Sequence, residues 1–387
     1  MAQPDSAPEA PAARRRHDVL VVGASFAGVA CAIQAARAGL RVVLIERKAD
    51  VGEKLHTTGI VVKEAADEIE RLGRLPPELI RPIRGVRLYG SKLGSVALDS
   101  PGYFFLATDT PKLMRWMVKQ ATDAGVDVRL RTLFAGAQRE ADGFAVADVG
   151  RVRFIVGADG PTSKVARTFG LGVNREFLFG IEAELTGVTL PEPERLHCFL
   201  DRRLARGYIG WAFDGVGVTQ VGLALRQRRP GETPDLDAFL ERLTQVFDLA
   251  SINVVARRAG LIPVGGPVTP IAGDRVLLIG DAAGLVSPLT AGGIHTALES
   301  GRAAAVAIVT ALAREGEGEG SRVVLATIDV PQFRIKRLLR RAFDLFQSDW
   351  LFDLLLTTGA LRIAARLVYF HRRGLLSPAA WKELLRR

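Results

Sequence analysis

A glycine-rich turn carries the first chemistry that the sequence indicates. Residues 23–28 read Gly-Ala-Ser-Phe-Ala-Gly, which is GxSxxG where dinucleotide-binding turns usually show GxGxxG. Such a turn needs a tight first bend, a small residue where the backbone meets a pyrophosphate, and a last glycine for packing of helix on strand. We therefore predict that phosphates bind at a helix N-terminus formed by Gly23, Ser25, Phe26, Ala27 and Gly28.

A carboxylate further along the chain supports the same chemistry. Glu46 lies 23 residues after Gly23 and directly follows an apolar run over residues 41–45. It can accept hydrogen bonds from the ribose hydroxyls of an adenosine, and its charge disfavours a 2′-phosphate. Arg47 follows it and is included in the predicted cofactor site. A tight glycine turn without a ligand is the alternative, and the position of Glu46 argues against it.

The elements that position these residues form a βαβ unit. Residues 18–22 predict a strand, the alanine-rich stretch after the turn predicts a helix that continues to Ala38 with Gly39 as its C-cap, and residues 41–45 predict a second strand. The uncharged segment 19–36 approaches the length of a membrane span, but a buried strand and its crossover helix explain it. We predict no transmembrane helix.

Two later strands repeat one construction. Residues 151–156 lead into Gly-Ala-Asp-Gly at 157–160, and residues 275–279 lead into Gly-Asp-Ala-Ala-Gly at 280–284. After the first, Thr162 or Ser163 can cap a short helix that stops at Gly170. After the second, an alanine-rich helix runs from about Gly293 towards Ala313. We expect the three strand ends to meet at one crevice.

The pattern changes in the second half of the chain. Between residues 177 and 226 the apolar residues alternate, for example over 180–185 and 218–225, which predicts an inserted antiparallel sheet. Residues 315–321 read EGEGEGS and predict a flexible linker. Residues 332–346 then place an apolar stripe on a basic helix.

Three segments together resemble a known fold. VVGASFAG…IER, GADGPTSKVAR and VLLIGDAAGLVSPLTAGGIHTALESG are similar, in this order and spacing, to the FAD-binding fold of aromatic hydroxylases, flavin halogenases and geranylgeranyl reductases. The match covers about residues 18–313 and implies FAD as the cofactor. It implies that Gly280 and Asp281 bind the ribityl and pyrophosphate region, and that backbone N–H groups face the flavin N1 and C2 edge from Gly292, Gly293 and Ile294. It also implies that Asp159 and Gly160 shape the pyrophosphate and ribityl channel. In hydroxylase relatives, the corresponding residues are expected to touch a nicotinamide donor.

Among these families the geranylgeranyl reductases resemble the chain most closely. Residues 54–60, KLHTTGI, are similar to that family's Lys-x-Cys-Gly-Gly-Gly-Ile loop beside the flavin, and residues 288–294, PLTAGGI, resemble its Pro-x-x-Gly-Gly-Gly-Ile stretch. Residues 207–213, GYIGWAF, followed by Val-Gly-Leu at 221–223, are similar to its Tyr-x-Trp-x-Phe-Pro signature. The resemblance places Lys54, Gly59 and Pro288 at the cofactor.

The chain departs from that family's motifs at four places. His56 replaces the cysteine, one residue is added between Tyr208 and Trp211, and Asp214 stands where a proline is expected. Thr110 falls where an arginine or glutamine commonly contacts the flavin. These differences concern the substrate and the reaction rather than the cofactor.

The resemblance implies a reductase that transfers hydride from N5 of reduced flavin to a carbon–carbon double bond of an apolar, isoprenoid-type substrate, while a positioned acid supplies the proton. The candidate acids by position are His56, Tyr208 and His295. The predicted lining of an apolar cavity is Phe199, Trp211 and Phe213. A structural role is the alternative for each histidine, and ordinary core packing for each aromatic residue.

Two other functions stay open on this scaffold. One is a flavin-dependent monooxygenase that hydroxylates or epoxidises an aromatic or apolar substrate, and the other is a flavin-free prenyl-lipid carrier. The Trp-x-Trp-x-Ile-Pro pattern of halogenases is missing, with only Trp211 in place. No second glycine fingerprint is present, so an NAD(P)H donor would bind without its own Rossmann domain. A separate electron-donor protein is the other source of electrons.

Composition sets the class of protein. The chain has 387 residues, 48% hydrophobic and 24% charged, which supplies enough apolar material for a large core divided between two domains. Its two cysteines, Cys31 and Cys198, make neither a disulfide framework nor a four-cysteine metal site. We predict no metal site and a cytoplasmic location. Residues 1–16 lack the apolar core of a signal peptide and predict a disordered leader.

These observations predict an α/β, Rossmann-like FAD-binding fold of the aromatic-hydroxylase type, with an inserted antiparallel β-sheet substrate domain and a helical C-terminal cap. The FAD-binding domain is assigned to residues 17–85, 105–170 and 262–313. The substrate domain is assigned to residues 86–104 and 171–261, the linker to 314–321 and the helical C-terminal region to 322–387.

Positive charge gathers at the end of the chain. Residues 332–387 hold twelve basic and four acidic side chains, and this excess of +8 carries most of the net charge of +10. Such a basic region, with its apolar stripe, is typical of a lid that rests on an anionic membrane surface, here the inner face of a membrane. A helical cap with a solvated basic face is the alternative. We expect no nucleic-acid partner, because no recognisable module accompanies the charge.

Overall fold

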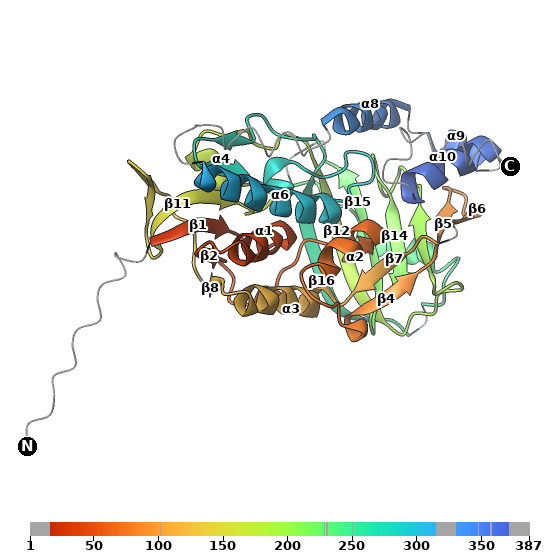
Figure 1. Ribbon diagram of the computed structural model, residues 1–387. Helices are drawn as coiled ribbons and strands as arrows, with labels where there is room; N and C mark the ends of the chain where they lie inside the picture. The colour runs from red at the N-terminus through yellow and green to blue at the C-terminus, as the bar shows by residue number, and fades with distance from the viewer. Residues whose placement is uncertain are drawn as a thin grey trace, which may run out of the picture.

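The computed structural model describes residues 16–100, 102–227, 229, 231–249, 251–314, 330–346, 348–356 and 358–370. Residues 1–15 of the predicted leader, the predicted linker after Arg314 and the basic segment after Phe370 lie outside them. Figure 1 shows a layered α/β part beside a part built of long strands, with helices from the end of the chain running along one side. The predicted fold class is confirmed.

The first sheet has eight strands and a parallel centre. Its order is β17-β18-β11-β1-β2-β8, and β10 and β9 add to it antiparallel beside β11. The strands are β1 (Arg16–Val22), β2 (Val42–Ile45), β8 (Asp127–Arg129), β9 (Gln138–Glu140), β10 (Gly143–Val146), β11 (Gly150–Gly157), β17 (Ala272–Gly273) and β18 (Val276–Leu278). Because β1 pairs in parallel with β2 and β11, and β11 with β18, the carboxyl ends of these four strands share one edge.

Helices cover both faces of this sheet. Val19 and Val21 of β1 are buried with α1 (Phe26–Arg37), α3 (Thr110–Asp123) and α6 (Ile294–Ala313). Leu20 and Val22 point the other way and pack with α4 (Lys164–Thr168). The alternation explains why β1 reads as a continuous apolar run, since both of its faces are buried. The predicted βαβ unit is confirmed, with Gly39 at φ +87 just after α1.

Among the described helices, α6 alone is long and apolar enough to cross a membrane. However, 44% of its apolar window is buried inside the protein. A Cβ on Gly301 would come within 2.3 Å of the Ala27 carbonyl oxygen, so α6 approaches the backbone of α1 closely. Close packing against α1 therefore explains why α6 is rich in small apolar residues, as a helix of the protein core is.

The second sheet is the inserted antiparallel sheet that the sequence predicts. Within the described residues it has seven strands in the order β16-β12-β15-β14-β13-β5-β6, of which only β13 and β5 pair in parallel. They are β5 (Gly85–Tyr89), β6 (Ser95–Asp99), β12 (Phe177–Thr186), β13 (Arg195–Phe199), β14 (Gly210–Asp214), β15 (Thr219–Arg226) and β16 (Asn253–Pro263). β16 runs through the predicted domain boundary at 261/262 and ends at Pro263, which has no N–H to donate.

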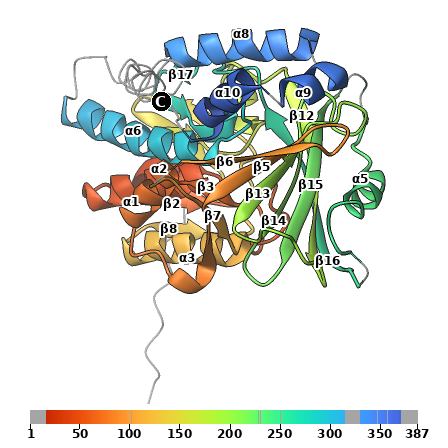
Figure 2. The ribbon, with the colours of Figure 1, turned by 90° about the vertical axis from the view of Figure 1, so that its right-hand side faces the viewer.

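The two faces of the second sheet have different surroundings. The outer face carries Phe199 and Ala212 and packs against α5 (Leu236–Leu243), which lies at the side of the sheet in Figure 2. The inner face carries Trp211 and Phe213 and packs towards Phe105 of the third sheet described below. The inner face is therefore turned towards the rest of the molecule.

A small third sheet, absent from our predictions, lies between the two large ones. It has the order β3-β7-β4, with β3 (Ile60–Val62), β4 (Ile80–Ile83) and β7 (Phe105–Thr108) antiparallel. α2 (Lys63–Glu70) and the short helix η2 (Pro77–Leu79) join β3 to β4. Phe105 packs towards the second sheet and Leu106 towards the first core, so β7 joins the two parts.

Three helices form the described part of the C-terminal region: α8 (Val330–Phe346), α9 (Asp349–Leu355) and α10 (Gly359–Phe370). The predicted basic helix is confirmed as α8. Phe370 lies 5.9 Å from Phe105 between ring centroids, and the Asp353 carboxylate accepts a hydrogen bond of 2.7 Å from Ser91. These contacts attach the cap to β7 and to the turn after β5.

Candidate functional site

The glycine turn is locked against the end of β11. Gly23 has φ +104, and a Cβ there would lie 2.5 Å from the Ala158 carbonyl oxygen. A Cβ on Gly28 would lie 2.0 Å from the Gly23 oxygen, so neither position accepts a side chain. Ser25 caps α1 by accepting from the Gly28 N–H at 3.3 Å and donates to the Ala158 oxygen at 3.1 Å. Serine therefore replaces the second glycine with a useful hydrogen bond.

Glu46 stands beside this turn at the end of β2. Its carboxylate accepts hydrogen bonds of 3.0 Å from the backbone N–H groups of Ala24 and Lys48. Two bonds leave acceptor capacity on the oxygens for a pair of hydroxyl groups. The carboxylate is half-buried, whereas the next residue, Arg47, is exposed.

The third strand end reaches the same place. Gly280, in the short helix η3 (Gly280–Ala283), has φ +56, and a Cβ there would lie 2.9 Å from the Ala27 Cβ in the first turn of α1. Burial raises the pKa of Asp281 to about 6, and none of the described residues donates a hydrogen bond to its carboxylate. A Cβ on Gly293 would lie 3.4 Å from Asp281 Oδ1. Gly293 is the N-cap of α6, and no side chain of the described residues caps that helix.

Asp159, which follows β11, stabilises the local fold. Its carboxylate accepts from the Ser163 hydroxyl at 2.6 Å and from the backbone N–H groups of Lys164 and Val165 at 2.6 and 3.0 Å. It thereby fixes the start of α4, where Ser163 is the N-cap. Gly160 follows with φ +83 and open space around the Cβ position.

These residues fit FAD. Three features lie at one edge of the first sheet. They are a glycine turn that has no room for a Cβ, the start of α6 without a cap from a described side chain, and the buried Asp281 carboxylate without a donor among the described residues. Helix N-termini suit a pyrophosphate and the negative edge of a reduced flavin, and carboxylates suit ribose and ribityl hydroxyls. Glu46 and Asp281 are the residues that would hold those hydroxyls.

We expect Glu46→Gln to weaken FAD binding about tenfold, because a charge-assisted hydrogen bond to the ribose becomes a neutral one. The amide also brings donors next to the Ala24 and Lys48 N–H groups. A flavin fluorescence titration measures the dissociation constant. Glu53→Gln changes an exposed carboxylate in the next turn and should leave the constant unchanged. Equal affinities for the two variants would remove Glu46 from the site.

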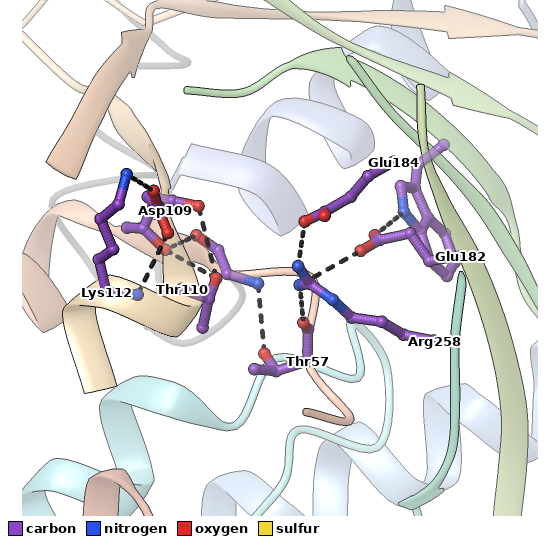
Figure 3. A network of polar contacts seen from close by, with 10 residues as sticks. Thr57, Asp109, Thr110, Lys112, Glu182, Glu184 and Arg258 are labelled. Atoms are coloured by element: carbon purple, nitrogen blue, oxygen red, sulfur yellow. Dashed lines mark hydrogen bonds and ion pairs between the residues drawn. The ribbon is translucent and has the colours of Figure 1, made fainter. Parts of the chain in front are cut away.

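A second group of polar residues lies on the inner face of the second sheet. Trp211, Gly222, Glu182 and Arg258 face one another on β14, β15, β12 and β16. A Cβ on Gly222 would lie 2.5 Å from the indole ring, so the glycine lets Trp211 lie across β15. The indole N–H then donates to Glu182 Oε2 at 2.9 Å, and Arg258 bonds to Glu184 (Figure 3). We call Glu182, Glu184, Arg258 and Trp211 the inner-face cluster.

Known proteins match most of the chain. Residues 16–330 match the family model described as an FAD binding domain. A digeranylgeranylglycerophospholipid reductase of Methanopyrus kandleri is 33% identical over 317 residues, covering 74% of this chain and 75% of that protein. Another, of Methanosphaera stadtmanae, is 30% identical over 317 residues, covering 76% and 78%. The chain belongs to the geranylgeranyl reductase family of FAD-binding proteins.

Solved structures agree with the fold of this family member. A geranylgeranyl bacteriochlorophyll reductase-like protein of Thermoplasma acidophilum superposes with a TM-score of 0.80 at 21% identity, covering 96% of this chain and 99% of that one. A flavin-dependent brominase gives a TM-score of 0.73 at 17% identity. The chain is an FAD-dependent oxidoreductase with FAD as its cofactor, and the flavin-free carrier is set aside.

The family's loop at residues 54–60 joins the FAD-binding part to the inner face. The His56 ring lies over Gly260 of β16, where a Cβ would come within 2.7 Å of the His56 Cβ, and its Nδ1 is 2.6 Å from the Ala259 oxygen. The Thr57 oxygen accepts from Arg258 at 3.5 Å. Gly59, with φ +70, is buried against the Thr110 hydroxyl. Lys54 is exposed.

The departures from the family's motifs have structural partners. Thr110 starts α3, is fully buried and lies 3.0 Å from the Thr108 hydroxyl, while Asp109 caps the helix through the Lys112 N–H (Figure 3). Asp214 ends β14, where its carboxylate accepts from the Thr219 hydroxyl at 2.8 Å and lies 3.3 Å from Arg81 of β4. Asp214 thus ties the second sheet to the third.

The other two candidate acids lie near the start of α6. The Tyr208 hydroxyl donates to the Thr290 oxygen, next to the predicted flavin edge, and burial raises the pKa of Tyr208 well above its ordinary value. His295 lies in the first turn of α6 with its Nε2 3.6 Å from Glu299 Oε1. Pro288 is buried, and its oxygen accepts from the buried Arg340 of α8 at 3.4 Å.

The three predicted lining aromatics do not lie together. Trp211 and Phe213 are buried on the inner face. Phe199 points to the outer face, where it stacks on Tyr89 at 4.5 Å between centroids and packs on Phe239 of α5. The reason is the strand register: Cys198 pairs with Trp211, so the next residue along β13 turns to the opposite face. The prediction that Phe199 lines the same cavity as Trp211 and Phe213 is therefore corrected.

The three charged residues of the inner-face cluster were not predicted from the sequence. Glu182 and Glu184 sit at buried or half-buried positions of a strand that otherwise alternates with apolar residues, and Arg258 is mostly buried opposite them. Charged residues in the middle of a buried strand require partners. That pattern is the signal in the sequence that marks these residues.

Proposed function

We propose that the protein is an FAD-dependent reductase that saturates carbon–carbon double bonds of an isoprenoid lipid. When bound, reduced FAD supplies hydride. The observation that carries the proposal is the inner face of the second sheet, which offers an apolar wall with one buried acidic cluster, the surroundings that a prenyl chain and a proton require. The names of the relatives, digeranylgeranylglycerophospholipid reductases, support the same substrate class.

The described residues contribute packing and polarity rather than a large set of charged groups. Leu178, Cys198 and Phe213 surround Trp211 on the inner face, and Phe370 of α10 closes over Phe105. A wall of this kind excludes water from an apolar chain. It favours reduction over chemistry that stabilises a polar peroxide.

Anaerobic photoreduction of the purified flavoprotein tests the proposal. A lipid with geranylgeranyl chains is added to the reduced protein, and re-oxidation of the flavin is followed with the mass of the lipid. We expect a product that gains two hydrogen atoms per double bond. Insertion of oxygen into an aromatic or apolar substrate after admission of air would support a monooxygenase instead. NADPH, NADH and reduced ferredoxin are compared as sources of electrons.

We propose further that α8 to α10 rest on an anionic membrane surface at its cytoplasmic side. Arg334, Arg337 and Arg341 are exposed on one side of α8 together with Leu338, which is 67% exposed. Trp350 of α9 is also 67% exposed. Basic side chains near such a surface contribute roughly 1 kcal/mol each, and buried apolar side chains add to this.

We expect Leu338→Asp to lower binding to anionic vesicles at least tenfold, because a residue that enters the lipid becomes one that the surface repels. Flotation with phosphatidylserine vesicles at low and high salt measures the binding. Leu133→Asp is the matched control, since Leu133 is 68% exposed and lies between β8 and β9 of the first sheet, outside α8 to α10. Equal flotation of both variants, or binding that salt does not weaken, would contradict the proposal.

A further inference from the structure

The inner-face cluster contains more negative than positive charge. Glu182 and Glu184 offer two carboxyl groups, and Arg258 is the one cation facing them among the described residues. Arg258 makes its close pair with Glu184 and stays 4.0 Å from Glu182 Oε1. One guanidinium bound tightly to one carboxylate leaves the second without a full counter-charge.

Glu182 is therefore the member of the cluster that retains a proton. It is 4% exposed, and burial raises its pKa to about 7 against the opposing effects of Trp211 and Arg258. Trp211 donates to Oε2, whereas Oε1 has no hydrogen-bond donor among the described residues. An ionised oxygen without a donor is costly in such a place, while a protonated carboxyl is not.

Few titratable groups face Glu182 from the neighbouring strands. Trp211 on β14 and Gly222 on β15 carry no charge, Glu184 is on the same strand, and Arg258 lies on β16. The next titratable group is His56. It lies over Gly260, two residues after Arg258 on β16, and its ring is bound to the Ala259 oxygen. Glu184 and Arg258 are therefore the charged groups that face the Glu182 carboxyl, whose pKa is set first by burial and next by the Trp211 hydrogen bond.

We propose that Glu182 holds the proton that the reduction consumes, and that Trp211 and Arg258 are positioning residues for it. This inference rests on the proposed function. Saturation of a double bond adds a hydride with its electron pair to one carbon and a proton to the other; reduced flavin is the source of the hydride, and the Glu182 carboxyl supplies the proton. The carboxylate left behind regains a proton from solvent before the next turnover.

The first test reads the protonation of Glu182 without any turnover. Trp211 donates to the same carboxyl group, so its fluorescence should change as Glu182 ionises, with a midpoint near pH 7. The full-length flavoprotein is titrated between pH 5 and pH 9. We expect the transition to disappear in Glu182→Gln and in Trp211→Phe, and to persist in Trp116→Phe, which removes an indole from α3.

The second test is the pH profile of lipid reduction. We expect the wild-type rate to fall as pH rises through about 7, and Glu182→Gln to be slower by about 100-fold with no such limb. Glu182→Asp should restore part of the rate together with the limb. Absorbance of bound flavin checks that each variant is loaded.

The outcomes separate this inference from the proposed function. If lipid reduction proceeds but Glu182→Gln keeps the wild-type rate and limb, or the fluorescence transition survives in that variant, Glu182 is not the proton holder. If the wild-type protein reduces no prenyl lipid while the Glu182-dependent transition is present, the proposed function fails and the protonated state of Glu182 stands.

Discussion

Replacing Gly23 by alanine is expected to give a folded protein that no longer retains FAD. At φ +104 an L residue is strained by roughly 1–2 kcal/mol, and the new Cβ would lie 2.5 Å from the Ala158 oxygen. β1 and β11 pair along their whole length there, so the backbone of β11 cannot retreat. We expect the turn to open instead, which moves the N–H groups of α1 away from the position that we propose for the pyrophosphate. We expect the dissociation constant to rise more than about 100-fold in a flavin titration.

Gly39→Ala is the matched control at the other end of α1. Gly39 has φ +87, and no atom of the described residues lies within 4 Å of its Cβ position, so the variant carries similar backbone strain without the clash. It should lose about 1 kcal/mol of stability and keep its affinity for FAD. If both variants bind FAD equally well, the turn does not hold the pyrophosphate.

The FAD-binding half is predictable from the sequence because its chemistry is local. Gly23, Ser25 and Gly28 specify the turn within six residues, and Glu46 follows one strand later. The strand ends before Asp159 and Asp281 repeat one construction, and parallel pairing brings them to a common edge. What the sequence does not reveal is how a carboxylate is used: Asp159 accepts hydrogen bonds from the first two N–H groups of α4, whereas Asp281 has no donor among the described residues.

The inner face is less predictable because it depends on register between distant strands. Phe199 and Trp211 look equivalent in sequence, yet the pairing of Cys198 with Trp211 sends them to opposite faces. Glu182 meets Arg258 only because β12 pairs with β16, and the indole reaches Glu182 only because Gly222 lies between them. No local spacing encodes these three relations. The small third sheet was missed for a related reason, since its strands have three or four residues and come from separate segments.

Replacing Arg258 by methionine is expected to destabilise the protein by about 4 kcal/mol at pH 8, because a buried and a half-buried carboxyl group lose the cation that faces them. The Thr57 oxygen also loses a donor. Urea unfolding at saturating FAD measures the free energy. Arg257→Met is the control: Arg257 is the neighbouring exposed residue, its partner Asp237 is exposed too, and its removal should cost almost nothing.

The loss in Arg258→Met should depend on pH with a definite sign. A carboxyl group whose pKa is raised on folding imposes no penalty where both states are protonated, and the penalty grows as pH rises from the unfolded pKa to the folded one. Glu182 already shows this shift, from 4.5 to about 7, because it is buried, and removal of Arg258 takes away the cation that opposes the shift. We therefore expect less than half of the loss at pH 5, and partial recovery at pH 8 in Glu184→Gln/Arg258→Met, which removes one of the two charges. A loss independent of pH would mean that Arg258 stabilises the sheet by packing alone.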